Sequence, residues 1–171
     1  MKVFLYILFI VCCFWPVQVS AQFINIQIDV EPEVETIVEQ SLDFGQVISG
    51  SGLQQIAPGD ASMGIFKLNA LRTQKLLVSL EPDEVLTHAN PAVTASIPIN
   101  LQAAYTNNGI SDVRNSVPLN SLYENIIVEG PPANPRSTWS AVHIYIYGSI
   151  DIGNTPAGIY RGQVVLTVIY E

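Results

Sequence analysis

The sequence predicts an all-β sandwich of seven to nine strands, formed by one domain. Short runs of alternating apolar and polar residues recur between clusters of Gly, Pro and Asn, and almost no stretch shows the helical period. The chain has 171 residues, of which about 150 remain once an expected leader is removed. A domain of that length buries roughly 68–70% of its unfolded surface, so one core is sufficient to stabilise it.

The leader is an export signal at residues 1–21. Lys2 supplies a positive charge, residues 3–15 form an apolar stretch, and Val19-Ser20-Ala21 is a small-residue cleavage site. The apolar stretch is short for a membrane span, which favours cleavage over anchoring. We therefore expect a secreted chain that begins at Gln22 and has no membrane contact after cleavage.

Both cysteines, Cys12 and Cys13, lie in this leader, so the expected domain at residues 22–171 has no disulfide and no thiolate chemistry. A lipoprotein is the alternative, although lipid-modified cysteines usually follow a small residue and Cys12 follows bulky ones. Removal of Lys2 leaves six basic and fifteen acidic residues, a formal net charge of −9. We expect no nucleic-acid partner, because affinity for phosphate rests on clustered Lys and Arg.

Eight strands are expected along the chain. In order they cover residues 23–31, 36–48, 64–70, 75–80, 93–105, 123–128, 141–152 and 159–170. The first alternates apolar and polar residues cleanly and stops at Pro32, and the second is broken near Gly45. The third, fourth and sixth are short runs between turn residues. In the fifth, Pro98 has no backbone N–H to donate to a neighbouring strand. This predicts that the strand lies at the edge of the sheet, or that its pairing within the sheet begins at Pro98.

The last two strands are expected to form a terminal hairpin. The seventh has two distinct faces: Val142, Ile144, Ile146, Ile150 and Ile152 on one, and His143, Tyr145, Tyr147 and Asp151 on the other. In the turn that follows, Pro156 fixes φ and Gly158 is free to take a positive φ. The final strand places four apolar side chains on one face: Val164, Leu166, Val168 and Tyr170. Val165 and Ile169 make its other face only half polar.

Three short motifs resemble those of a known group of proteins: Leu42-Asp43-Phe44-Gly45, Pro156-Ala157-Gly158 and Tyr160-Arg161-Gly162. The group consists of uncharacterised secreted bacterial proteins that are fimbria-like and related to the spore coat protein U family. The resemblance covers about residues 23–171. Spore coat U proteins are in turn similar to the subunits of chaperone–usher pili, which end with a glycine fourteen residues from the C-terminus, alternating apolar residues and a penultimate tyrosine. Here these elements correspond to Gly158, the apolar row of the final strand, and Tyr170.

The resemblance implies an immunoglobulin-like sandwich that lacks one strand, located in the periplasm or on the cell surface of a Gram-negative-type bacterium. In such subunits the groove is filled first by a periplasmic chaperone and then by the N-terminal extension of the next subunit, by β-augmentation. The implied partners are copies of the chain or related subunits, together with a chaperone. The implied acceptor residues are Gly158, Tyr160, Val164, Leu166, Val168 and Tyr170, and the donor residues are Ile24, Ile26, Ile28 and Val30. The alternative is that residues 23–31 complete the domain's own sheet. Many pilus subunits carry an internal disulfide, which this mature chain lacks.

We expect no enzyme, no cofactor and no metal ion. A catalytic triad would need the residue types found at Ser140, His143 and Asp151, but their closeness in the sequence is better explained by coincidence. The acidic residues near His88, namely Glu81, Asp83 and Glu84, match no calcium-loop signature and indicate a solvated turn. Alternate carboxylates at Glu31, Glu33 and Glu35 are likewise expected on an exposed strand face.

The predicted function is a non-enzymatic exported structural subunit of a cell-surface or fimbria-like assembly. The alternative is a self-complete secreted module that binds a carbohydrate or a protein ligand. Tyr145 and Tyr147 share a strand face and could form an aromatic platform for sugars if Trp139 or Tyr123 lies nearby.

Overall fold

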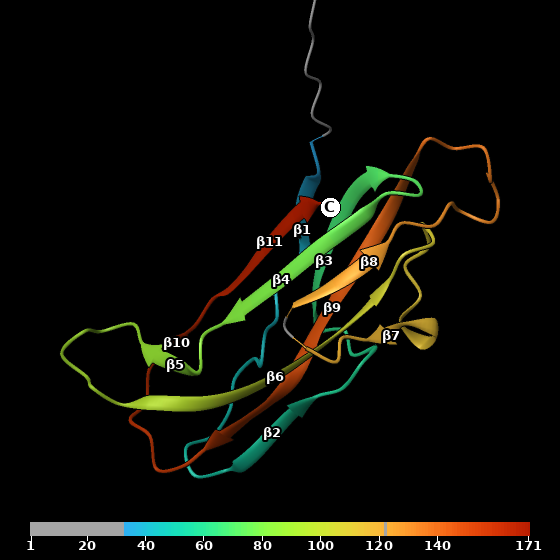
Figure 1. Cartoon of the computed structure of the whole chain (residues 1–171). Helices are drawn as coiled ribbons and strands as arrows, with labels where there is room; N and C mark the ends of the chain where they lie inside the picture. Colours follow the sequence, from blue (N-terminus) through green and yellow to red (C-terminus); the bar gives the residue numbers. More distant parts are fainter. Residues whose placement is uncertain (1–32, 122) are drawn as a thin grey trace, which may run out of the picture. The chain divides into compact units, whose positions relative to one another are not determined.

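The computed structural model describes residues 33–121 and 123–171, which belong to one compact unit. Within these ranges eleven strands form two antiparallel sheets, and a 3-10 helix, η1 (Val113–Asn115), makes a single turn (Figure 1). No helix in this part of the chain is long and apolar enough to cross a membrane. The prediction of an all-β protein is confirmed.

The larger sheet is built around one long central strand. Its strands are β1 (Glu35–Gln40), β2 (Gly52–Ile56), β3 (Gly64–Leu71), β5 (Val85–His88), β6 (Ser96–Thr106), β7 (Val117–Pro118), β9 (Trp139–Ile152) and β10 (Tyr160–Arg161). The main order is β1-β3-β9-β6-β5-β10, while β2 pairs with β9 and β7 pairs with β6. On one side β9 pairs first with β3, as far as the Ile146–Gly64 pair, and then with β2, from the Gly148–Ile56 pair onward. β9 therefore changes partner at Gly148.

The smaller sheet has three strands in the order β11-β4-β8. They are β4 (Lys75–Pro82), β8 (Tyr123–Ile127) and β11 (Val164–Tyr170). Because side chains alternate faces along a strand, each sheet offers one apolar face to the main core. The buried members of this core are Leu68, Ala70, Leu76, Val78, Leu80, Ala103, Ile126, Val128, Val142, Ile144 and Ile146.

The outer face of β9 is also buried over part of its length. Tyr145 points away from the main core and packs with Ile56 and Met63 in a second cluster. Its hydroxyl lies 3.2 Å from Oγ1 of Thr106 and 3.3 Å from Oγ of Ser111. This is why both faces of β9 are apolar or aromatic here, where a sheet with one solvated face would alternate.

The structure differs from the strand predictions in several places. Residues 41–48 form no strand: the carboxylate of Asp43 accepts a hydrogen bond from the N–H of Gly45 (2.8 Å), and Gly45 has a φ of 69°, so this motif is a turn. β2, β5 and the two-residue β7 were not expected. Of the two alternatives for Pro98, the edge strand is wrong, because β6 lies between β9 and β5. The other alternative agrees with the structure: Pro98 pairs only with β5, and the pairing of β6 with β9 begins directly after it, at Ile99.

The expected terminal hairpin is wrong. Residues 159–170 form two strands: β10 pairs with β5 in the larger sheet, and β11 pairs with β4 in the smaller one. The chain changes sheet at Gly162 and Gln163. Asp83 fixes this crossing, since its carboxylate accepts a hydrogen bond from the N–H of Gln163 (2.7 Å) and its own N–H donates to the Gln163 carbonyl (2.9 Å). The expected strand at residues 23–31 lies outside the described residues.

Candidate functional site

Strand β11 has one paired edge and one edge with no described partner. Its ladder with β4 runs from the Val164–Pro82 pair to the Tyr170–Leu76 pair. Among the described strands none occupies its other side. Within residues 33–121 and 123–171, the backbone N–H and C=O groups on that side have no ladder partner, and an edge of this kind can pair with another strand.

The apolar row of β11 is only partly covered. Val164, Leu166, Val168 and Tyr170 all pack against the main core, yet each is half-buried. Three of their four partners on β4 are almost fully buried: Leu80, Val78 and Leu76 have exposures of 3%, 1% and 0%, while Pro82, opposite Val164, is half-buried. The row is thus part of the core on its β4 side and open on the other. On the opposite face Val165 and Ile169 are exposed.

Strand β1 is the corresponding end strand of the larger sheet. It pairs with β3, and its Val38 and Thr36 lie opposite Phe66 and Leu68, so both point to the side of the main core. Val38 is nevertheless 57% exposed. Strands β1 and β11, one at an end of each sheet, therefore both leave apolar side chains uncovered beside the main core.

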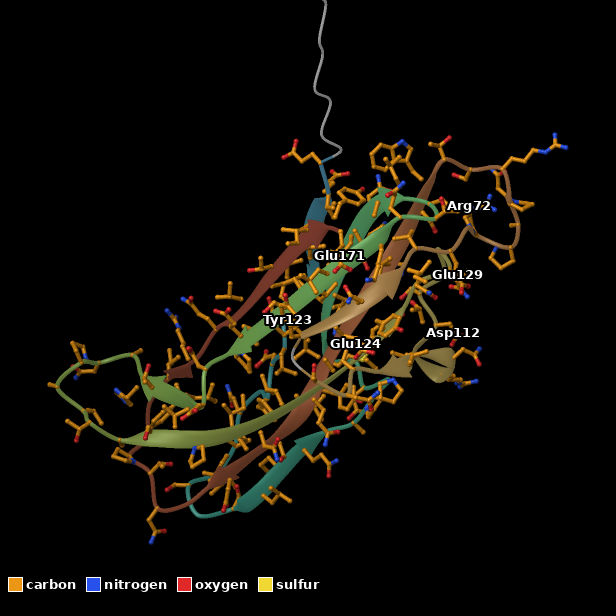
Figure 2. The ribbon with its side chains drawn as sticks, viewed as in Figure 1. Arg72, Asp112, Tyr123, Glu124, Glu129 and Glu171 are labelled. Atoms are coloured by element: carbon orange, nitrogen blue, oxygen red, sulfur yellow. The ribbon has the colours of Figure 1, made fainter. Side chains whose placement is uncertain are left out.

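The two end strands run in opposite directions along this open side. The Tyr170 hydroxyl, at the end of β11, accepts a hydrogen bond from the backbone N–H of Leu71 (3.0 Å). Glu35, at the beginning of β1, pairs with Asn69, which is two residues before Leu71 on β3. The end of β11 and the beginning of β1 therefore lie at the same end of β3, as Figure 1 shows for the dark red and blue strands. Glu171, labelled in Figure 2, extends the pairing with β4: its N–H donates to the Lys75 carbonyl (2.9 Å), and its carboxylate forms an ion pair with the Lys75 amine.

Two residues of the expected acceptor set lie elsewhere. Tyr160 belongs to β10 in the larger sheet and donates a hydrogen bond to the carbonyl of Pro156 (2.9 Å). Gly158 lies in the loop before β10 and does not have a positive φ. A Cβ at this position would overlap Nε2 of His88, so any other residue would require the His88 ring to move. The structure thus groups Val164, Leu166, Val168 and Tyr170, but not Gly158 and Tyr160. The expected donor residues Ile24, Ile26, Ile28 and Val30 lie outside the described residues.

The residues considered for catalysis all lie on β9. His143 and Asp151 are eight positions apart on this extended strand, which separates them by about 27 Å at 3.4 Å per residue. Ser140 and His143 are both buried, and neither Ser140 Oγ nor His143 Nδ1 has a hydrogen-bond partner among the described residues. Burial lowers the pKa of His143; Glu39 opposes this shift and Lys67 adds to it. These residues form no triad.

The aromatic platform suggested by the sequence does not form. Tyr145 is buried, and its ring stacks on His143 with the centroids 6.5 Å apart. Trp139 is eight positions from Tyr147 on β9, again about 27 Å. Tyr123 belongs to β8 in the smaller sheet, as Figure 2 shows. On the outer face of β9 Tyr147 is half-buried and Trp139 is exposed, but the two are too far apart to form one platform.

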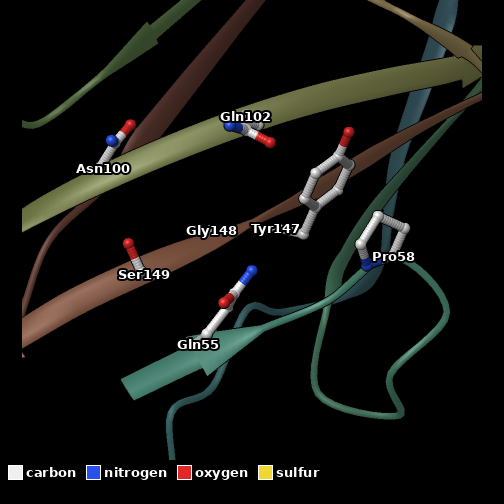
Figure 3. Close-up of a pocket in the computed structure, with 7 residues that line it drawn as sticks. All are labelled: Gln55, Pro58, Asn100, Gln102, Tyr147, Gly148 and Ser149. Atoms are coloured by element: carbon white, nitrogen blue, oxygen red, sulfur yellow. The ribbon is translucent and has the colours of Figure 1, made fainter. Parts of the chain in front are cut away.

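Tyr147 instead borders a hollow of about 190 Å³ that the sequence did not indicate (Figure 3). The hollow lies over β6, β9 and β2, where β9 changes partner. It is lined by Gln55, Pro58, Asn100, Gln102, Tyr147, Gly148 and Ser149. Asn100 and Gln102 were visible in the sequence as the polar face of an alternating strand, but Gln55 is placed beside them only by the pairing of β2 with β9.

Comparison of the sequence with protein-family models finds no match, and comparison with curated proteins finds no significant match.

Proposed function

We propose that the chain is a non-enzymatic, exported structural subunit of a cell-surface or fimbria-like assembly, and that it associates by β-strand complementation. The observation that carries the proposal is the apolar row of β11, which is packed against the core on one side and open on the other. The domain is then an immunoglobulin-like sandwich that is completed by a strand from another chain. Such a strand would gain ladder hydrogen bonds from the free edge and bury its apolar side chains against the row.

The proposed donor is the segment at residues 22–31. Its four apolar positions, Ile24, Ile26, Ile28 and Val30, are spaced two apart, as are the four positions of the row on β11. Both sets span seven residues, or about 20 Å of extended chain. One set can therefore interleave with the other along its whole length.

The direction of β1 favours donation between chains. A single strand between β1 and β11 must be antiparallel to one and parallel to the other. Four residues separate Val30 from Glu35, enough for a hairpin with β1 but not for a parallel crossover, which needs a dozen or more. Within one chain, residues 22–31 could therefore run only parallel to β11. From a neighbouring chain they can run antiparallel to β11, which is the slightly more stable pairing.

The two arrangements can be distinguished by engineered disulfides, because the expected mature chain contains no cysteine. Donation antiparallel to β11 places Val30 near Val164, so V30C combined with V164C should link different chains. Self-completion parallel to β11 places Ile24 near Val164, so I24C combined with V164C should close a loop within one chain. Non-reducing gel electrophoresis of both variants separates the outcomes.

The assembly itself is tested by light scattering. The chain from Gln22 should form polymers, and the chain without residues 22–31 should remain folded and monomeric. I26D combined with I28D should abolish assembly, whereas N25D combined with Q27D adds the same charge to the polar face and should leave it intact. If the chain from Gln22 is a stable monomer and the truncated chain unfolds, the segment is an ordinary core strand and the proposal is wrong.

A further inference from the structure

The hollow over β6, β9 and β2 has a structural cause at Gly148. β3 begins opposite Ile146 and β2 ends opposite Gly148, so a loop must bridge the two strands beside β9. Pro58 in that loop forms one wall, and the Tyr147 ring stands between Pro58 and Gln102 (Figure 3). Three paired strands, β6, β9 and β2, therefore form the floor of the hollow, and the loop with Pro58 forms one wall.

Its polar groups are arranged in two rows across the sheet. Asn100 on β6, Ser149 on β9 and Gln55 on β2 occupy paired positions and so point to one side. In the next row, Gln102 is paired with Tyr147. The rows are about 7 Å apart, and neighbouring strands are about 4.8 Å apart. Three exposed amides, a half-buried hydroxyl and a half-buried aromatic ring thus border a hollow that is open to solvent and about one small ring in size.

None of these side chains makes a hydrogen bond with another described residue, although several other amides of the chain do. Gln40 Nε2, for comparison, donates to the carbonyls of Ala61 and Met63. The amides of Gln55, Asn100 and Gln102 each retain two donors and one acceptor oxygen. No lining residue is charged. The hollow therefore offers many neutral hydrogen-bonding groups and one aromatic face.

We propose that this hollow binds one neutral monosaccharide unit of a glycan. Vicinal hydroxyls both donate and accept, which matches the amides, and the apolar C–H face of a pyranose packs on a ring such as that of Tyr147. The volume of about 190 Å³ is below the range of about 300–1,000 Å³ that is usual for drug-sized ligands, so the hollow takes one ring and leaves the rest of the glycan outside. The site is in the larger sheet, and the free edge of β11 is in the smaller one. Sugar binding therefore does not depend on strand pairing.

The test is saturation-transfer difference NMR on the chain from Gln22, because this method observes the ligand and tolerates large assemblies. The probes are glucose, galactose, mannose and N-acetylglucosamine, each titrated to concentrations on the order of 10 mM, with triglycine as a peptide probe. At least one sugar should receive saturation, mainly on the protons of one ring face. Removal of one amide in Q55A or Q102A should weaken its binding about two- to tenfold.

The matched control is Q54A, which removes the neighbouring amide on the opposite face of β2 and should not change binding. Y147F should retain most of the affinity, and Y147L should lose it, because only the first keeps the aromatic face. Circular dichroism establishes that each variant is folded. Saturation of triglycine but of no sugar, saturation of no probe at all, or equal sugar affinity in the wild type, Q102A and Y147L would each overturn the proposal.

Discussion

The side-chain hydroxyl of Tyr170 accepts a hydrogen bond from the backbone N–H of Leu71, at 3.0 Å and across 99 residues of sequence. Tyr170 ends β11 in the smaller sheet, and Leu71 ends β3 in the larger one. This bond therefore ties the two sheets together at one end of the open side between β11 and β1. The penultimate tyrosine has a role within the domain in addition to any role in strand pairing.

We expect Y170F to destabilise the domain by about 1 kcal/mol, because it leaves the partly buried N–H of Leu71 without its acceptor. The free energy of unfolding from urea titration measures this change. Y123F is the matched control, since Tyr123 is exposed on β8 and its hydroxyl has no described partner. Equal stability of Y170F and the wild type would show that the bond contributes nothing.

We expect G158A to destabilise the domain by about 1–3 kcal/mol, because the added Cβ would overlap the ring of His88. This ring cannot move freely: Nδ1 accepts a hydrogen bond from the N–H of Asn90 (3.0 Å), and the ring packs edge-on against Tyr160 at a centroid distance of 5.1 Å. In an H88A background the overlap is absent, so G158A should cost much less there.

A double-mutant cycle over these two positions measures the coupling from denaturant titrations. G153A is the control for the loss of glycine itself, since a Cβ at Gly153 meets no atom within 4 Å. If G158A and G153A cost the same, or if the cost of G158A is unchanged in H88A, His88 is not the reason for glycine at this position.

The sequence was most informative where a strand packs against the main core. β3, β4 and β9 were located to within a few residues, because their apolar side chains recur at every second position, and β8 was located by its apolar run between turn residues. β2 has no such pattern: Leu53 is exposed, and Ile56 is buried at its end. β5 lies among acidic residues that indicated a turn. Both strands form because they hydrogen-bond to a neighbouring strand, β2 to β9 and β5 to β6.

The division of residues 159–170 into two strands was likewise hidden. It depends on Asp83, which is 80 residues away from its partner Gln163. Of the candidate sites, the apolar row of β11 follows from the period of two alone. The hollow could not be predicted, because it requires the register that places Gln55 and Asn100 on either side of Ser149.

We expect the domain to lose stability as the pH falls below about 6.5. Burial lowers the pKa of His143 in the folded protein, while Glu39 on β1 and Lys67 on β3 act in opposite directions. The unfolded chain, with a histidine pKa near 6.5, therefore binds a proton more readily than the folded chain does. The stabilisation is complete above that value and is lost as the pH falls toward the folded pKa.

Thermal unfolding of the wild type and H143F between pH 5.5 and 7.5 measures this effect. H143F removes the titrating group, so its stability should vary less with pH over this window. The carboxylates contribute equally to both proteins, and the difference between the two curves isolates His143. Parallel curves would mean that His143 does not contribute to the pH dependence.

We expect G148A to be more damaging than G158A. A Cβ at Gly148 would overlap the carbonyl oxygen of Asn100 and lie 3.0 Å from Cα of Leu101, both of them backbone atoms of β6. Backbone in a sheet cannot rotate aside as a histidine ring can, and a φ of 155° is itself unfavourable for alanine. The cost should therefore exceed about 3 kcal/mol, measured by urea titration with G153A as the control. Because Gly148 is where β9 changes partner, any folded fraction of G148A should also have lost the hollow, and with it the binding of sugar. A folded G148A with wild-type stability would show that β6 and β9 do not approach this closely.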